Sequence, residues 1–133
     1  MTNHISESSL PRAVGRFVDV VNRSDCEQAI AAFAADAFVN DIRREFSGTA
    51  AIRAWLDREI IGDSVRLEVL EARTHYETTI VTARTTGSFD KSNLPDPLDL
   101  TYYFTTSPDV ITQLIVIANQ PTPDWASSQH GAP

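Results

Sequence analysis

Apolar residues recur at helical spacing through the first sixty positions of the chain and at alternate positions through the next fifty-odd. The first stripe predicts a helix that begins near Pro11, and its members are Leu10, Val14, Phe17, Val18 and Val21. Ser24 followed by Glu27 is a capping-box pattern. It predicts a second helix, ending near Asp36, whose buried face comprises Ala29, Ile30 and Phe33.

A third helix is expected after residues 47–49, and Gly62 suits a left-handed cap at its end. Its apolar positions are Ile52, Trp55, Leu56 and Ile60. Before it, residues 37–41 read as a short strand and residues 42–46 as a charged loop. After Gly62 the period falls to two, which predicts four strands, at 65–69, 78–89, 98–106 and 110–118.

Helices followed by strands, without alternation, favour an α+β fold. We expect a curved, antiparallel-rich mixed sheet that wraps three N-terminal helices in a cone with an internal pocket. The domain is expected to span residues 10–119. A flexible N-terminus (1–9) and a loose C-terminal tail (120–133) are expected around it.

Length and charge restrict the classes of partner. The chain has 133 residues, which favours one domain, and a net charge of −7, which disfavours nucleic acid and membrane surfaces. Cys26 is the single cysteine, and residues 1–10 lack the pattern of a signal peptide, so a cytoplasmic protein is expected. The three histidines and one cysteine give no metal-ligand spacing, and no phosphate-binding loop is found, so no cofactor is expected.

Three stretches carry a resemblance to a known family. They are GRFVDVVNRSDCEQAIAAFAADAFVND (15–41), FSGTAAIRAWL (46–56) and PDVITQLIVIAN (108–119). Together they resemble the nuclear transport factor 2-like superfamily, which includes the SnoaL-like polyketide cyclases and the ketosteroid isomerases. The resemblance covers roughly residues 10–119 and implies the cone fold. Its implication for function is broad, because the superfamily holds isomerases, cyclases, dehydratases, epoxide hydrolases and proteins without chemistry.

Asp41 is similar in position to the proton-abstracting base of the isomerase branch. A carboxylate inside an apolar cone loses hydration, and its pKa rises toward the range that a general base needs. The alternative is that Asp41 ends its strand through a turn hydrogen bond. Tyr102 is the expected hydroxyl partner if Leu98, Leu100, Tyr102 and Phe104 form the inner face of their strand. The alternative for Tyr102 is a core tyrosine bonded to a backbone carbonyl.

Two groups of the isomerase branch are replaced here. Phe17 stands where those enzymes have a tyrosine, and Leu100 stands where they have a second acid. Loss of one such donor typically costs about 10²–10³ in rate, so steroid isomerisation is not expected. The epoxide-hydrolase branch uses an Asp-Arg-Asp relay, but Thr86 occupies the place of the acid after Arg84. Arg84 is therefore expected to pair with a carboxylate such as Asp41 or Glu68, or to face solvent.

These observations give two hypotheses. In the first, the chain binds an apolar or aromatic small molecule and acts as a cofactor-free isomerase, cyclase or lyase, with Asp41 as general base and Tyr102 as partner. The expected pocket walls are Phe17, Phe33, Phe38, Trp55, Leu100 and Phe104. In the second, the chain is a non-catalytic ligand-binding or dimerisation module. Under either, a homodimer through the outer sheet face, including the Thr-rich strand 78–88, is expected.

Overall fold

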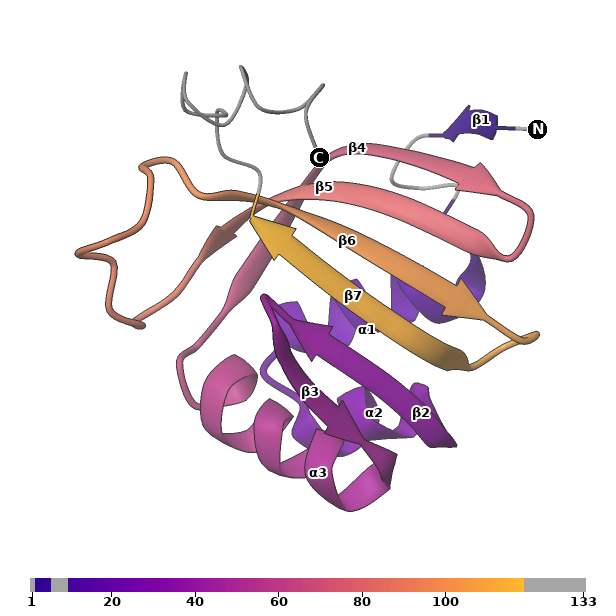
Figure 1. Ribbon diagram of the computed structural model, residues 1–133, viewed down its shortest axis with the longest axis horizontal. Coiled ribbons are helices and arrows are strands. Elements are labelled where there is room, and N and C mark those ends of the chain that lie inside the picture. Colours follow the sequence, from indigo (N-terminus) through magenta and orange to yellow (C-terminus); the bar gives the residue numbers. More distant parts are fainter. Residues whose placement is uncertain (1, 6–9, 119–133) are drawn as a thin grey trace, which may run out of the picture.

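The computed structural model describes residues 2–5 and 10–118, and in it the helices pack against one face of a curved, open sheet (Figure 1). Helix α1 (Arg12–Asn22) buries its predicted apolar stripe, including Phe17 and Val21. Helix α2 (Cys26–Ala31) is capped by the side chain of Asp25, which accepts from the backbone N–H of Gln28 at 3.1 Å. Helix α3 (Gly48–Trp55) continues into a π-helical turn, η2 (Leu56–Ile61).

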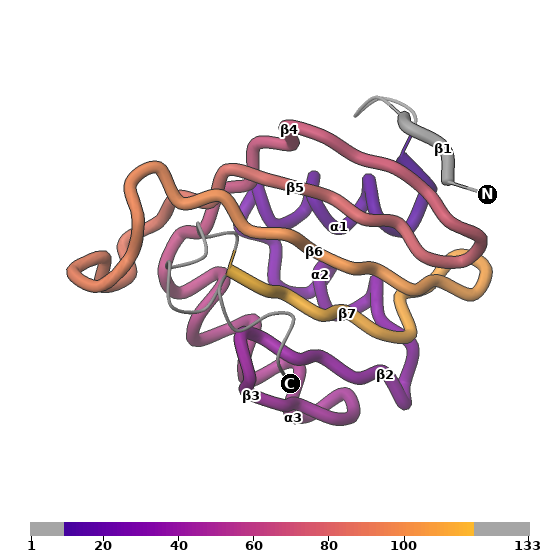
Figure 2. Tube along the Cα trace, turned by 45° about the horizontal axis from the view of Figure 1, so that its top comes forward, coloured from indigo at the N-terminus to yellow at the C-terminus, as the bar shows by residue number. Residues whose placement is uncertain are grey.

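Seven strands form the sheet, in the order β1-β4-β5-β6-β7-β2-β3. Their bounds are β1 Thr2–Ile5, β2 Phe33–Asp41, β3 Arg44–Ser47, β4 Arg66–His75, β5 Thr78–Thr86, β6 Asp99–Thr106 and β7 Ile111–Ala118. Neighbours run antiparallel except β2 and β7, which are parallel. Figure 2 shows α1 and α2 lying behind the strands, on the inner face of the sheet. The expected α+β class with a mixed sheet is confirmed.

The core lies between the helices and the inner sheet face, with Phe17 at its centre. The Phe17 ring meets the rings of Phe33 and Phe104 edge-on, at centroid distances of 5.5 and 5.6 Å. Strict alternation on β5 turns Thr79, Val81, Ala83 and Thr85 inward. The four strands predicted after Gly62 all form. However, β4 runs on to His75 with a register shift between Val69 and Glu71, and β7 leaves Ile117 exposed on its outer face.

The second helix is shorter than its sequence pattern predicts, because the residues expected at its end belong to strand β2. Helix α2 ends at Ala31, and Phe33 begins β2 rather than closing a helix. The backbone N–H of Ile111 donates to the carbonyl of Ala32 at 2.8 Å, and Phe33 pairs with Ile111 on β7. Pairing with a strand far along the chain thus overrides the local helical pattern.

Two turns also differ from expectation. Residues 42–46 are not a charged loop, because β2 and β3 form a hairpin whose two turn residues, Ile42 and Arg43, have φ of 49° and 76°. Positive φ at both positions gives the turn the twist of its strands. Gly62 is not a left-handed cap, since its φ is −61°. The left-handed residue after η2 is Ser64, with φ of 52°.

The two ends of the chain are described only in part. Residues 2–5 pair with β4 as strand β1, where a flexible segment was expected. The expected tail, 120–133, lies outside the described residues, as do residues 1, 6–9 and 119. Within the described ranges, no helix combines the length and the apolar character that a membrane crossing requires.

Candidate active site in the cone

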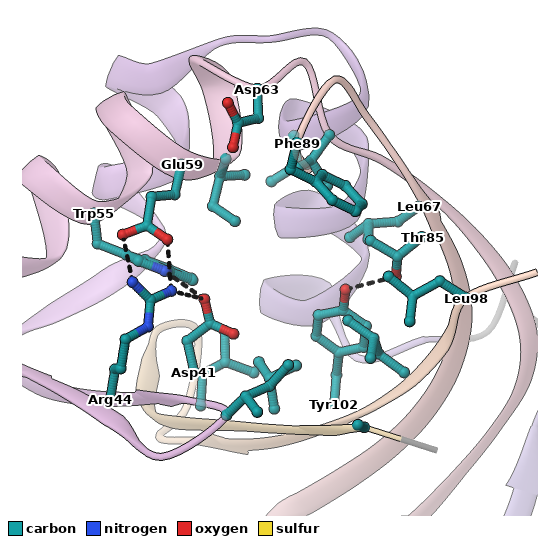
Figure 3. Close-up of a pocket in the computed structure, with 18 of the residues that line it drawn as sticks. Asp41, Arg44, Trp55, Glu59, Asp63, Leu67, Thr85, Phe89, Leu98 and Tyr102 are labelled. Carbon is teal, nitrogen blue, oxygen red and sulfur yellow. Dashed lines mark hydrogen bonds and ion pairs between the residues drawn. The ribbon is translucent and has the colours of Figure 1, made fainter. Parts of the chain in front are cut away.

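A cavity of about 210 Å³ opens between α1, η2 and the inner face of the sheet (Figure 3). Most of its wall is aliphatic or aromatic, and the polar side chains gather on two sides of it. The lining residues are Phe17, Val21, Asp41, Ile42, Arg44, Trp55, Glu59, Ile60, Asp63, Val65, Leu67, Thr85, Phe89, Leu94, Leu98, Leu100, Tyr102, Leu114, Val116 and Ala118. An enclosed apolar wall with a few polar groups is typical of a small-molecule site.

Asp41 reaches this cavity because it ends β2 on the strand's inner face. Ala37 and Val39 are fully buried on the same face. The Oδ2 atom of Asp41 accepts a hydrogen bond from Trp55 Nε1 at 2.9 Å and another from Arg44 Nη2 at 3.1 Å. Its second oxygen points into the open space in Figure 3. The side chain is 16% exposed, so Asp41 combines a held oxygen with one that faces the cavity.

The charge partner of Asp41 is Arg44. The Arg44 guanidinium also binds both oxygens of Glu59, at 2.9 and 2.5 Å, so it bridges the β2–β3 hairpin to η2. Hydrogen bonding to Glu59 raises the pKa of Arg44, and the nearby Asp41 charge adds to the effect. The guanidinium therefore remains a cation at the edge of the cavity.

The hydrogen-bond partner of Arg84 is a carboxylate, but it is neither Asp41 nor Glu68. Arg84 is paired with Asp99, through Nε at 2.9 Å and Nη2 at 3.2 Å. On the outer face of the sheet, Arg84 lies between Glu68 on β4 and Asp99 on β6, directly opposite each. Its hydrogen bonds go to Asp99, and the Glu68 charge adds to the rise in the Arg84 pKa. The bond from Arg84 lowers the pKa of the Asp99 carboxyl.

Tyr102 lies on the inner face of β6, across the cavity from Asp41 (Figure 3). Its hydroxyl is 2.8 Å from Thr85 Oγ1, and Thr85 in turn donates to the carbonyl of Ala83 at 3.3 Å. Since Thr85 has one proton, that arrangement has Tyr102 donating to Thr85. Burial raises the pKa of Tyr102, and the Asp41 charge raises it further. The hydroxyl therefore stays protonated and available as a donor.

The expected pocket walls divide into two groups. Phe17, Trp55 and Leu100 line the cavity, as their positions suggested. Phe33 and Phe104 do not, because they pack around Phe17 in the core behind it. Phe38 does not either, since alternation along β2 turns it to the face opposite Val39.

Several residues of the site were not expected from the sequence. Arg44 and Glu59 complete the network around Asp41, Asp63 follows η2, and Phe89 and Leu94 come from the segment between β5 and β6. The sequence did contain one indication of this network: an acidic residue, Asp41, and a basic residue, Arg44, flank the two residues that form the turn. No grouping of three or more His, Cys, Asp or Glu side chains in the described part of the chain could hold a metal ion.

Solved structures share this architecture. No family model matches the chain, and no curated protein matches it. An NTF2-like protein of Cytophaga hutchinsonii has a TM-score of 0.67 at 10% identity, over 86% of this chain and 91% of that one. A protein of Catenulispora acidiphila with a ketosteroid isomerase-like fold, in complex with trimethylamine, has a TM-score of 0.69 at 17% identity, over 94% and 96%. The chain therefore has the nuclear transport factor 2-like, ketosteroid-isomerase-like cone fold, as its sequence predicted.

One solved structure of this fold is also similar to the chain in sequence. A "putative polyketide cyclase" of Sinorhizobium meliloti is 28% identical, with a TM-score of 0.74, over 84% of this chain and 99% of that chain. The two chains therefore share a domain of nearly the same extent. The chain is therefore similar in both fold and sequence to a protein named as a polyketide cyclase.

Proposed function

We propose that the chain is a SnoaL-like pocket protein that catalyses cofactor-free isomerisation, cyclisation or elimination on an apolar or aromatic carbonyl compound. One observation carries the proposal: the Asp41 carboxylate and the Tyr102 hydroxyl face the same apolar cavity from opposite sides (Figure 3). A base and a hydrogen-bond donor that converge on one small volume are the minimum for proton abstraction beside a carbonyl group.

In the proposed reaction, the cavity-facing oxygen of Asp41 removes a proton from the carbon next to the substrate carbonyl. Negative charge then develops on the carbonyl oxygen, and the Tyr102 hydroxyl donates to it. For that donation Tyr102 turns from Thr85 to the substrate, and the Thr85 hydroxyl, 2.8 Å away, can donate to Tyr102 instead. The enolate is then reprotonated at another carbon, attacks a second carbonyl carbon, or expels a leaving group.

Trp55 and Arg44 have a positioning role in this proposal. Both donate to Oδ2 of Asp41, so the carboxylate cannot rotate freely and its other oxygen is directed at the cavity. Trp55 is only 2% exposed, and its ring is stacked on Phe46. This packing keeps the indole N–H directed at Asp41. A base whose orientation is fixed beforehand loses less entropy when it meets the substrate.

The wall also restricts the charge of the ligand. Asp41, Glu59 and Asp63 contribute three carboxylates to the cavity lining and Arg44 one guanidinium, so an anionic ligand would be repelled. An uncharged carbonyl compound fits this wall. The replacement of isomerase donors by Phe17 and Leu100, both in the wall, supports a substrate other than a steroid.

The test is a screen of small ketones and epoxides for turnover, followed by Asp41→Asn. The substitution keeps the shape and the acceptor for Trp55 but removes the base, so turnover is expected to fall by at least about 10²-fold while ligand affinity changes little. Asp63→Asn is the matched control, because it removes another carboxylate of the same wall and should leave turnover intact. Unchanged turnover in Asp41→Asn would remove Asp41 from the mechanism.

The alternative is a non-catalytic module for ligand binding or for dimerisation. The outer face of the sheet favours dimerisation. Ile80, Tyr103 and Ile115 are aligned across β5, β6 and β7, and Ile117 follows in the next row. Ile117 is 44% exposed. We propose that these four residues, the outer patch, bury against the same patch of a second copy.

A further inference from the structure

Phe89 separates the cavity from a second hollow on the far side of the segment that follows β5. This second hollow measures about 310 Å³, and its walls include Arg84, Lys91 and Asp96. The two spaces share four wall residues: Thr85, Phe89, Leu94 and Leu98. In Figure 3 the Phe89 ring stands at the edge of the cavity, between η2 and the Leu98 wall.

The Phe89 ring is held in this position from several sides. A Cβ atom on Gly87 would lie 2.8 Å from Cε2 of the ring, so the ring packs closely over a residue without a side chain. The Lys91 ammonium lies 5.1 Å from the ring centroid and donates to the carbonyl of Gly87. Ser88 donates to the carbonyl of Asp63 through its N–H at 2.7 Å and its hydroxyl at 3.0 Å.

The volume of the cavity limits what it can hold. An apolar cavity of about 150 Å³ accepts one benzene molecule, whereas sites for drug-sized ligands measure about 300–1,000 Å³. At about 210 Å³, the cavity is closer in size to a site for one substituted ring than to a site for a drug-sized ligand. Beyond Phe89 and its neighbours, the second hollow offers further space that a second ring could occupy.

We propose that Phe89 is a specificity-determining residue that limits how far a ligand can extend toward the second hollow and so favours single-ring ligands. The ring closes the cavity on the side of the second hollow, and Gly87 and Lys91 fix it there. The proposal rests on the proposed function only in that the cavity binds an apolar carbonyl compound. It does not depend on Asp41 acting as a base.

The experiment compares the affinities of cyclohexanone and 1-tetralone, a one-ring and a two-ring ketone, for the whole chain and for Phe89→Ala. Calorimetry is expected to show that the unaltered chain binds cyclohexanone the more tightly. Phe89→Ala should raise the affinity for 1-tetralone by about tenfold or more relative to cyclohexanone. Phe38→Ala, which trims a phenylalanine on the opposite face of β2, is the matched control and should leave the ratio unchanged.

Phe89→Leu provides a graded variant if the alanine substitution unfolds the chain, and it should shift the ratio in the same direction by less. Equal affinities in the unaltered chain, or an unchanged ratio in folded Phe89 variants, would overturn the proposal. Binding of neither ketone would overturn it together with the proposed pocket function. Size selection without any turnover of ketones would leave Phe89 in its role and contradict only the proposed chemistry.

Discussion

At the scale of single residues, the two oxygens of Asp41 have different surroundings. One accepts from Trp55 and Arg44, and the other faces the cavity. Arg44 gives its two closer bonds to Glu59, so Asp41 receives only a share of the guanidinium charge. A carboxylate held in this way keeps its orientation, and its second oxygen remains free to accept a proton or a hydrogen bond from the substrate.

The pH dependence of Tyr102 can be predicted with its sign. Burial raises the pKa of Tyr102 in the folded state, so the folded chain holds this proton more tightly than the unfolded chain. The resulting stability is fully present below the ordinary tyrosine pKa of about 10 and is lost as pH rises through the folded value. We expect the Tyr102 phenolate absorbance at alkaline pH to appear only as the chain unfolds.

The measurement is an ultraviolet titration of the chain, with circular dichroism followed in parallel. Tyr102→Phe should remove the component that appears with unfolding, and Tyr103→Phe, on the opposite face of β6, is the control that should keep it. Ionisation of Tyr102 near pH 10 in a fully folded chain would contradict the predicted direction.

The faces of these side chains were predictable from the sequence, and their partners were not. Alternation along residues 98–106 turned Tyr102 inward on the condition that Leu98, Leu100 and Phe104 were buried, and all three are. The partner of Arg84 depended on the register between β5 and β6, which no local pattern specifies. Arg44 was missed because its contact with Glu59 joins two elements that are separate in sequence.

At the scale of elements, η2 shapes one wall of the cavity. Its widened turn, together with the residues that follow, presents Glu59, Ile60 and Asp63 to the cavity. Gly62 closes this turn, and a Cβ atom there would overlap the carbonyl oxygens of Arg58 and Asp57, the latter at 2.8 Å. Glycine is therefore required for close packing of backbone rather than for a left-handed conformation. π-helical turns are frequent at functional sites.

Two glycine substitutions are expected to act in opposite directions. Gly62→Ala should lower the free energy of unfolding by about 1–3 kcal/mol, because the new methyl group has no space. Gly15→Ala, in the middle of α1, should raise it by up to about 1 kcal/mol, since its Cβ would lie 3.7 Å from Leu10 Cβ, an ordinary contact.

Urea denaturation of both variants beside the unaltered chain measures these differences. If Gly62→Ala proved as stable as the parent while Gly15→Ala gained stability, the turn would be able to relax. The close packing assigned to Gly62 would then be wrong.

Element types were well predicted where the hydrophobic period was long and uninterrupted. Strands β4 to β7 formed as expected. Residues 37–41 were also predicted as a strand, but most of β3 was read as a charged loop. Ile42 and Arg43 are the reason, because neither is a residue that commonly adopts the positive φ that this turn requires. The π-helical turn has no established sequence signal, so its effect on Glu59 could not be anticipated.

At the scale of the whole molecule, one sheet face encloses the cavity and the other displays the outer patch. Ile117→Lys places a charge within the proposed contact and is expected to convert a dimer into a monomer. Tyr76→Lys, in the exposed β4–β5 turn, is the control and should leave the dimer intact. Size-exclusion chromatography with light scattering measures both. A concentration-independent monomer in the unaltered chain would contradict the proposed dimer.

The overall class was predictable because helices precede strands along the chain, and an antiparallel-rich sheet follows from that order. The position of β2 was not, since its parallel pairing with β7 joins the early part of the described chain to its last strand. Parallel neighbours require a long connection, and local patterns carry no information about which strands will be joined.

That parallel pair has a kinetic consequence. Asp41 lies opposite Arg44 in the hairpin and opposite Val116 on β7, so its backbone joins the rest of the sheet only when the last described strand has docked. During synthesis on the ribosome, helices and hairpins with local contacts can form early, but this site cannot exist until β7 has emerged. Contacts between distant parts of a chain slow folding. Ligand binding at the cavity would therefore report completed assembly, and a ligand present during synthesis could not guide the earlier steps.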